Sequence, residues 1–327
     1  MAFTTDRRTM FKLAGGAAAV LAAPQIMVRA ASAQIATAPE VGNAGFQSFK
    51  LGGFTVTSIL DGGRPSDGPH PTFGADQEAS AMAELMEANF LPSDKFVNGF
   101  APVIVDTGSE KILFDTGIGE GGRGNGLGQL RERMQAAGHA PDDIDIVVLT
   151  HFHGDHIGGL MEAGAPAFAN ARYVTGQAEY DFWTAPERAE GKTADAAKAV
   201  QVNVVPFAED TTFIGDGDEV VAGITAVEAF GHSPGHMAYH IESDGRRLLL
   251  TADTSNHYIA SLRRPDWHVE YDMDKEMAVE ARMRVFDMIA TDRIPFIGYH
   301  MPFPAVGFVE KIEQGYRYVP ATYQFDL

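Results

Sequence analysis

Cysteine is absent from this chain of 327 residues. Without thiols the protein has no disulfides, so its stability has to come from the hydrophobic core and from any bound metal. The absence also excludes thiolates as metal ligands. Imidazole and carboxylate groups are therefore the candidate ligands.

Basic residues are also scarce, with 25 Lys and Arg against 44 Asp and Glu and a net charge of −19. A nucleic-acid backbone needs a basic face, so this balance argues against nucleic acid as a partner. It argues equally against an anionic membrane surface. Solubility explains the acidic charge well, and a hydrophobic content of 45% is ordinary for a globular protein.

The N-terminal segment has the pattern of an export signal. Arg7 and Arg8 precede an apolar run from Leu13 to Val28, and the small residues 31–33 that follow the run suit cleavage. This pattern is typical of a signal peptide rather than a membrane anchor, and the paired arginines resemble the twin-arginine signal. We expect residues 1–33 to be that signal, residues 34–327 to form a single domain, and the mature protein to be periplasmic. The alternative is a disordered N-terminus.

Local patterns predict an α/β protein. Strands are predicted at 54–60, 102–106, 111–115, 145–149, 171–175, 219–221, 224–227, 238–241 and 247–250. Helices are predicted at 76–90, 127–137, 177–183, 187–200 and 274–291, the last with a buried stripe beginning at Met277. The polar stretch 64–74 and the glycine-rich stretch 116–128 are predicted as loops, the second one flexible. The order predicts two sheets packed face to face, with helices outside.

One motif concentrates groups that bind metal. Directly after the predicted strand 145–149, four such residues lie within six positions: His151, His153, Asp155 and His156. His151 and His153 point the same way in extended backbone, so they can share one ion. Asp155 and His156 follow a turn at Gly154 and can reach a second ion. The alternative, a solvated polar loop, does not explain this density of histidines.

Two ions need further ligands, and three candidates follow strands downstream. His232 lies in a tight turn after a predicted strand, Asp253 ends the apolar segment 248–253, and His300 ends a short apolar stretch. Each is a weak signal alone, because a single Asp or His at a strand end is more often structural. Residues at the ends of neighbouring strands converge on one edge of a sheet, however.

The combined order H-x-H-x-D-H, G-H-x-P-G-H, A-D and Y-H resembles the metallo-β-lactamase superfamily. That resemblance implies a four-layer αβ/βα sandwich of two mixed sheets with a dinuclear site at one edge. It also implies which residues bind which ion. His151, His153 and His232 would hold the first ion, Asp155, His156 and His300 the second, and Asp253 would bridge them. His236, His240 and His257 are interpreted as supporting or structural.

Within the superfamily, the chain most resembles methyl parathion hydrolases, through LGGFTVTSILDG, VDTGSEKILFDTG, AEYDFW, FGHSPGH and GYRYVP. It departs from them in the glycine-rich loop after Asp115, where those enzymes have an aromatic side chain, and in the polar stretch after Asp253. We therefore expect lactones or aryl esters as substrates ahead of phosphotriesters. Phe182 and Trp183 match the family's aromatic wall and are predicted substrate contacts, with core packing as the alternative. The resemblance also leaves room for a homodimer.

The predicted reaction is hydrolysis by a hydroxide that bridges two divalent ions. Asp253 or Asp155 would carry the proton, and the sequence does not choose between them. Ligands of nitrogen and oxygen suit Zn, Mn, Fe or Co, and we favour Zn. Alternatives are a periplasmic metal-binding protein without turnover, a β-lactamase, which the bridging Asp253 disfavours, and a nuclease, which the acidic charge disfavours.

Overall fold

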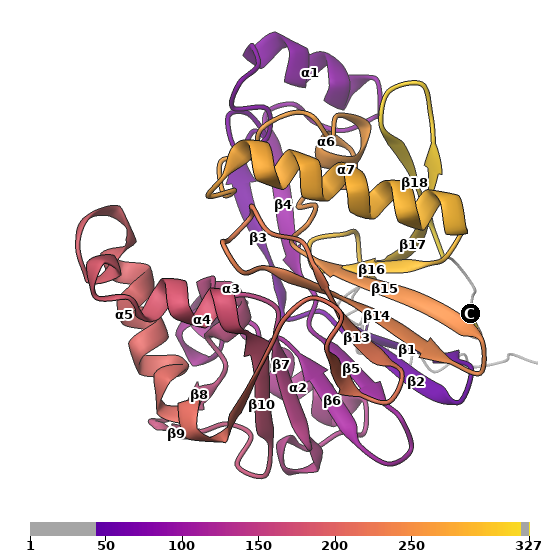
Figure 1. Ribbon diagram of the computed structural model, residues 1–327. Coiled ribbons are helices and arrows are strands. Elements are labelled where there is room, and N and C mark those ends of the chain that lie inside the picture. The colour runs from indigo at the N-terminus through magenta and orange to yellow at the C-terminus, as the bar shows by residue number, and fades with distance from the viewer. Residues whose placement is uncertain (1–43, 322–326) are drawn as a thin grey trace, which may run out of the picture. The chain divides into compact units, whose positions relative to one another are not determined.

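Two mixed sheets form the centre of the structure, a computed structural model that describes residues 44–321 and residue 327 (Figure 1). The first sheet has the strand order β1 (Phe46–Leu51), β2 (Phe54–Ile59), β5 (Val103–Asp106), β6 (Lys111–Phe114), β7 (Ile146–Leu149), β10 (Arg172–Gly176) and β11 (Thr211–Ile214). The second has the order β12 (Glu219–Val221), β13 (Ile224–Glu228), β14 (Met237–Ser243), β15 (Arg246–Ala252), β16 (Phe296–Gly298), β17 (Val306–Lys311) and β18 (Tyr316–Pro320). The predicted signal peptide, residues 1–33, lies outside the described residues.

Helices and two short ribbons complete the described part of the chain. The helices are α1 (Ala79–Glu87), α2 (Leu130–Ala136), α3 (Gly154–Ile157), α4 (Gln177–Thr184), α5 (Ala194–Asn203), α6 (Ala260–Arg263) and α7 (Lys275–Asp292). The 3-10 helices are η1 (Glu120–Asn125), η2 (Pro141–Asp143), η3 (Pro186–Ala189), η4 (Gly191–Thr193) and η5 (Val205–Asp210). The ribbons pair β3 (Gly62–Asp67) with β4 (Lys95–Phe100), and β8 (Met161–Glu162) with β9 (Ala165–Pro166).

Strand β7 shows how the layers arise. Its side chains alternate between two faces, and all four are buried. Ile146 and Val148 belong to the core cluster shared with the second sheet. Val147 and Leu149 belong to a separate cluster with Leu130 of α2 and residues of α4 and α5. On the other side of the second sheet, α7 contributes buried side chains to the shared cluster (Figure 1). The predicted four-layer sandwich is thus confirmed.

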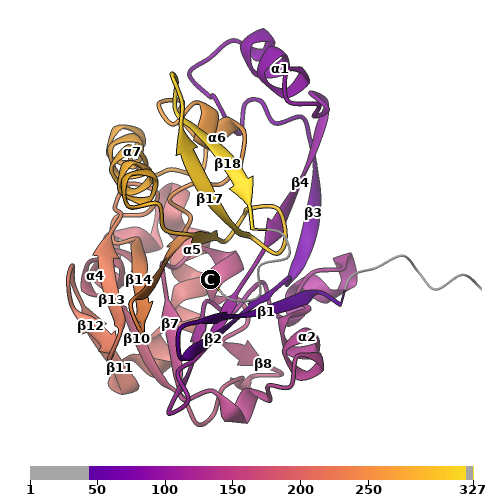
Figure 2. The ribbon, with the colours of Figure 1, turned by 90° about the vertical axis from the view of Figure 1, so that its right-hand side faces the viewer.

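The ribbon β3–β4 corrects the prediction that residues 64–74 form a loop. Arg64 pairs with Asn98, and Ser66 pairs with Phe96. The sequence of β3, GGRPSD, lacks the β-branched and aromatic residues that mark strands, so its conformation depends on pairing with β4. The ribbon runs from the first sheet to α1 (Figure 2). It forms one wall of the cleft described below.

Helix α7 begins as predicted but buries a different set of residues. The Asp274 side chain accepts a hydrogen bond from the backbone N–H of Met277, which caps the helix. Met277 itself is 44% exposed, so its predicted place in the buried stripe is wrong. Arg282 is fully buried instead. A buried charge with a distant partner cannot be anticipated from hydrophobic spacing.

Two further segments differ from their predictions. The glycine-rich stretch 116–128 contains η1 and is tied to the buried carboxylate of Asp61, which accepts backbone N–H groups from Ile118, Gly128 and Leu130. The predicted helix 187–200 is divided, because η3 and η4 precede α5. Among the described helices, none is both long and apolar enough to cross a membrane.

Parallel strand pairing brings the segments that carry the predicted metal ligands to the same edge of the sandwich. Strand β7 runs parallel to both β6 and β10, and its carboxyl end leads into His151. In the second sheet β15 and β16 are parallel, so the segments that carry Asp253 and His300 leave the sheet at the same end. The turn between β13 and β14 carries His232 to this edge.

Candidate metal centre

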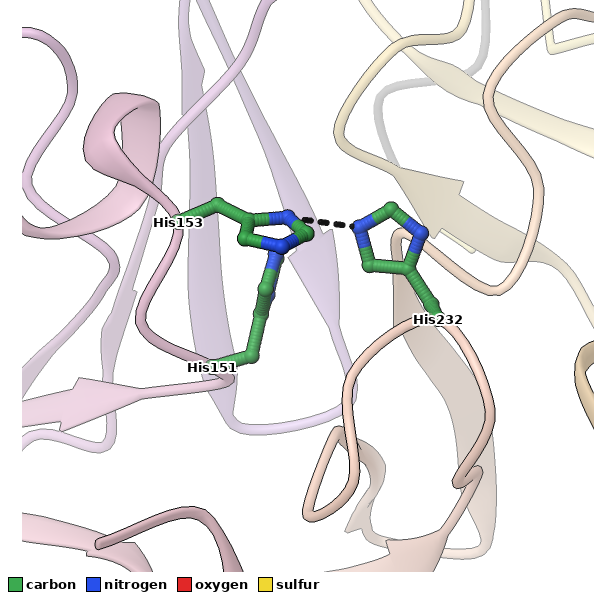
Figure 3. A group of neighbouring side chains, drawn as sticks. All are labelled: His151, His153 and His232. Atoms are coloured by element: carbon green, nitrogen blue, oxygen red, sulfur yellow. Dashed lines mark hydrogen bonds between the residues drawn. The ribbon is translucent and has the colours of Figure 1, made fainter. Parts of the chain in front are cut away.

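The first group of ligands consists of three histidines from two loops. His151 and His153 lie after β7, His232 lies in the turn before β14, and their donor nitrogens lie within 4.8 Å of one another. The rings face one another across the gap between the two loops, and His153 Nδ1 lies 2.9 Å from His232 Nε2 (Figure 3). This is the set predicted to hold the first ion.

The second group, Asp155, His156 and His300, has its donor atoms within the same limit. Asp253 lies between the two groups. One of its oxygens, Oδ2, is 3.3 Å from His232 Nε2 and 3.0 Å from His300 Nε2. The other, Oδ1, is 3.3 Å from His156 Nε2. The structure thus brings all seven predicted ligands together, with Asp253 in contact with both groups.

The unpaired atoms of this cluster fit divalent ions. His151 Nε2, His156 Nε2 and Asp253 Oδ1 are buried and make no hydrogen bond within the described part of the chain, although His156 Nε2 and Asp253 Oδ1 lie 3.3 Å from each other. A buried polar atom without a hydrogen bond costs about 1–3 kcal/mol, so this cluster indicates a ligand. Five imidazoles and two carboxylates are donors that suit zinc and related ions.

The histidines differ in their charge before any ion binds. Burial lowers the pKa of His151 well below its ordinary value and that of His153 to about 3, so both rings are neutral at pH 7. Burial also lowers the pKa of His232, but hydrogen bonds to Asp253 and Asp272 outweigh it and raise the pKa to about 9. Metal ligands must be deprotonated, so ion binding at His232 releases a proton.

Two ligand rings, those of His232 and His156, are oriented by buried carboxylates that accept from their Nδ1 atoms. The sequence did not predict these contacts. His232 Nδ1–H donates to Asp272 Oδ1 at 2.9 Å, and His156 Nδ1–H donates to Asp115 Oδ2 at 2.8 Å. Asp272 also accepts from the buried Arg282, and these two contacts lower its pKa despite burial. Holding Nδ1 in this way directs Nε2 toward the ion. Asp115 did carry a signal, since it ends a predicted strand beside the motif.

Glu179 of α4 joins the two loops that carry the first group. Its Oε1 accepts the Phe152 backbone N–H at 2.9 Å and the Trp183 indole N–H at 2.8 Å. Its Oε2 accepts the Ser233 hydroxyl at 2.6 Å and the Gly235 N–H at 2.9 Å. Burial raises the pKa of Glu179, and the four donors oppose that shift. One carboxylate therefore fixes the loop after β7 against the turn before β14.

We predict that Glu179→Gln loosens this connection. An amide has one acceptor oxygen, so its NH2 group faces two donors, and at least one buried N–H loses its partner. The free energy of unfolding of the metal-free protein should fall by about 1–3 kcal/mol, and the zinc dissociation constant should rise by about tenfold or more. Urea unfolding and competition with a chelator measure the two effects. Asp181→Asn, on the exposed side of the same helix, is the control and should change neither. Unaltered zinc affinity in Glu179→Gln would show that Glu179 does not position the ligands.

The three histidines that were predicted to be supporting or structural do not belong to the ligand groups. His236 Nδ1–H donates to Ala229 O, and its Nε2 accepts the Asp253 backbone N–H, so both nitrogens are occupied. His257 Nδ1 accepts two backbone N–H groups at the start of α6. His240 is half-buried on β14. His236 thus holds Asp253 in place, and none of the three belongs to the ligand groups.

A cleft of about 530 Å³ opens over the ligands. Its other lining residues are Arg64, Asn98, Ile118, Gly154 and Tyr271. Phe182 and Trp183, the predicted substrate contacts, are not among them. Trp183 is 2% exposed and packs in the core against Phe182, with its N–H held by Glu179. Trp183 is thus part of the core, Phe182 is half-buried against it, and substrate contact by these two residues stays a prediction. Trp183 also packs edge-on against His153, with the ring centroids 6.3 Å apart.

The sequence matches one protein family and is similar to several N-acyl homoserine lactonases. Residues 97–288 match the metallo-beta-lactamase superfamily. An N-acyl homoserine lactonase of Bacillus cereus is 28% identical over 213 residues, which are 61% of this chain and 76% of the relative. The N-acyl homoserine lactonase AiiA of Bacillus thuringiensis subsp. kurstaki is 30% identical over 164 residues, which are 47% of this chain and 59% of the relative.

Solved structures show the same fold. AidC, a dizinc quorum-quenching lactonase in complex with the product N-hexnoyl-L-homoserine, superposes with a TM-score of 0.75 at 24% identity, over 86% of this chain and 98% of AidC. The hydrolase AbOPH superposes with a TM-score of 0.78 at 23% identity, over 86% of this chain and 99% of AbOPH. At this identity the likeness concerns the fold alone.

These findings agree with the predicted class, a metal-dependent hydrolase of ester bonds that uses two divalent ions. The family match covers more than half of the chain, and the donor groups lie at the carboxyl ends of its strands, as the sequence predicted. The chain belongs to the metallo-beta-lactamase superfamily.

Proposed function

We propose that this protein hydrolyses lactones or aryl esters at a pair of zinc ions. The observation that carries the proposal is the position of Asp253, whose two carboxylate oxygens lie against different ligand groups. Two sequence relatives described as N-acyl homoserine lactonases support an ester-type substrate. When bound, two zinc ions acidify a water molecule and polarise the carbonyl oxygen of the substrate.

Asp253 and Asp155 have different roles in the proposed reaction. Asp253 is 3% exposed, and its Oδ2 already accepts a hydrogen bond from Asn256 Nδ2 at 2.9 Å, so it is held rigidly between the groups. The side chain of Asp155 is 25% exposed and lines the cleft. We assign proton transfer to the Asp155 carboxylate, because its side chain is 25% exposed whereas that of Asp253 is 4% exposed. Asp253 fixes the spacing of the site.

The cleft supplies groups that suit a carbonyl substrate. Arg64 and Asn98 face each other across the β3–β4 ribbon, and both line the cleft. Their N–H groups can donate to ester or amide oxygens. Ile118 is the residue of the glycine-rich loop that reaches the cleft. The methyl parathion hydrolases that the sequence resembles have an aromatic side chain in that loop. The aliphatic Ile118 at this cleft therefore disfavours an aromatic phosphotriester.

Steady-state rates with one zinc-loaded preparation test this ranking. We expect kcat/KM for lactones or aryl esters to exceed that for methyl parathion by about tenfold or more, since one lost aromatic contact removes roughly 1.4 kcal/mol. Metal-free enzyme is the control and should be inactive on both classes. A phosphotriester preferred over every ester and lactone would overturn the ranking. No turnover of any substrate would instead favour a metal-binding protein.

A further inference from the structure

Two side chains of the β3–β4 ribbon form a polar part of the wall of the metal cleft. Arg64 and Asn98 are directly paired across the ribbon, and both line the cleft. Directly opposed residues of antiparallel strands project to the same face, with their Cβ atoms about 5 Å apart. The guanidinium and the amide can therefore contact one group of a bound molecule, and we call these two residues the Arg64–Asn98 pair.

Both members of the pair lack a hydrogen-bond partner within the described part of the chain. Asn98 is only 5% exposed, yet its side-chain amide makes no hydrogen bond to residues 44–321 or 327. Arg64 makes neither an ion pair nor a hydrogen bond with these residues, and its guanidinium lies over the Phe100 ring, 5.8 Å from the centroid. A largely buried amide without a hydrogen bond, in the wall of a cleft, indicates a ligand that supplies the partner.

The residues that follow Asn98 on β4 hold the pair beside the metal centre. Gly99 O accepts a hydrogen bond from His300 Nδ1–H at 2.8 Å. The Phe100 ring, over which Arg64 lies, packs against the His300 ring with the centroids 5.5 Å apart. The pair is thus connected to a predicted ligand of the second ion through two successive residues. A molecule whose reactive carbonyl group lies at the ions can contact the pair with another of its groups.

A carboxylate is the group that suits this pair best. A guanidinium presents its N–H groups in a planar fork that matches the two oxygens of a carboxylate, and such charge-assisted bonds are about twice as strong as neutral ones. Asn98 Nδ2 can donate to one of the same oxygens. Among the described residues that line the cleft, Arg64 is the one lysine or arginine, and the carboxylates are Asp155 and Asp253. Both carboxylates are assigned to the metal ions, which leaves the charge of Arg64 to a bound molecule.

We propose that the Arg64–Asn98 pair binds a carboxylate that the substrate carries away from the ester bond that is cleaved. This inference rests on the proposed hydrolysis of lactones or aryl esters and narrows the substrates to those that bear a carboxylate. The chain has a net charge of −19 and repels anions as a whole, so such a substrate requires a local cation in the cleft. A neutral ester leaves the charge of Arg64 without a partner, and the pair therefore discriminates by charge.

Two substrates of matched shape test the pair. 4-Acetoxybenzoate and 4-acetoxybenzamide share the same acetate ester and differ in a carboxylate or an amide at the far end of the ring. For the zinc-loaded enzyme, kcat/KM should be at least tenfold higher for the carboxylate, and Arg64→Met should reduce this ratio by at least tenfold. Arg64→Lys keeps the charge without the fork and should retain part of the preference. Arg246→Met removes an exposed arginine from the start of β15 and should leave the ratio unchanged.

Binding of the corresponding anilides provides a readout that does not depend on turnover of an ester. In calorimetry with zinc-loaded protein, 4-acetamidobenzoate should bind at least tenfold more tightly than 4-acetamidobenzamide. Arg64→Met and Asn98→Leu should each weaken the binding of the carboxylate by about tenfold, since each removes a donor to a charged group.

Equal binding of the two anilides, or a carboxylate preference that survives Arg64→Met, would overturn the inference. In the second case the carboxylate would bind at the ions instead of at the ribbon. Carboxylate binding that depends on Arg64, without hydrolysis of any ester or lactone, would support the pair while refuting the proposed function. Hydrolysis of both esters with equal kcat/KM would support the proposed function and refute the pair.

Discussion

Asp253→Ala should yield a folded protein that retains neither metal ion at the affinity of the unsubstituted enzyme. The carboxylate lies 3.0 Å from His300 and 3.3 Å from both His156 and His232, so its removal takes away the donor that the two ligand groups would share. It also leaves five imidazoles with a single carboxylate, which reduces the negative charge that attracts cations. The rate should fall on the order of a thousandfold, because charge stabilisation worth several kcal/mol is lost.

Elemental analysis after dialysis against dilute zinc, combined with rates on an aryl ester, measures both effects. Asp266→Ala removes an exposed carboxylate elsewhere and serves as the control, with full occupancy and rate. Two tightly held ions per chain in Asp253→Ala would show that the carboxylate does not bridge the groups.

His300→Ala should remove one of the two ions and leave the other bound. Its Nε2 lies beside Asp155 and Asp253, and its Nδ1–H donates to Gly99 O at 2.8 Å. The first group, His151, His153 and His232, does not include it. The variant should therefore keep about one ion per chain and lose at least a hundredfold in rate, since one ion cannot both acidify the water and polarise the carbonyl as effectively as two. The fold should persist, because His300 is not part of the core clusters.

For His300→Ala, circular dichroism measures whether the fold persists, elemental analysis measures the zinc content, and kcat measures the loss of rate. His240→Ala, which removes a half-buried imidazole from β14, is the matched control and should retain both ions. A folded His300→Ala protein with one ion and an undiminished rate would remove the second ion from the mechanism.

The sequence predicted those parts of the structure that depend on local pattern. Strand β7 alternates and is apolar, the motif after it is dense in histidine, and Asp253 and His300 each follow a short apolar strand. Strand ends meet at one edge of a layered α/β fold, so the seven ligands could be proposed together. The start of the helix predicted at 274–291 was also correct, because α7 begins at Lys275 with Asp274 as its cap.

The supporting contacts could not be predicted, because they join residues that are distant in the sequence. His156 and Asp115 are 41 residues apart, and His232 and Asp272 are 40 apart. Glu179 has the local pattern of an ordinary polar position on a helix, and its role depends on the turn before β14, 56 residues further on at Gly235. The β3 strand was missed for a similar reason, since its pairing with β4 outweighs its poor strand propensity.

Stepwise zinc loading of the metal-free protein tests directly whether hydrolysis requires two bound ions. Rates on an aryl ester are recorded at each addition, while a parallel sample is analysed for bound zinc. The protein should bind about two ions per chain, and activity should become substantial only as the second site fills. Full activity with a single bound ion, or in metal-free protein kept in excess chelator, would contradict a two-ion mechanism.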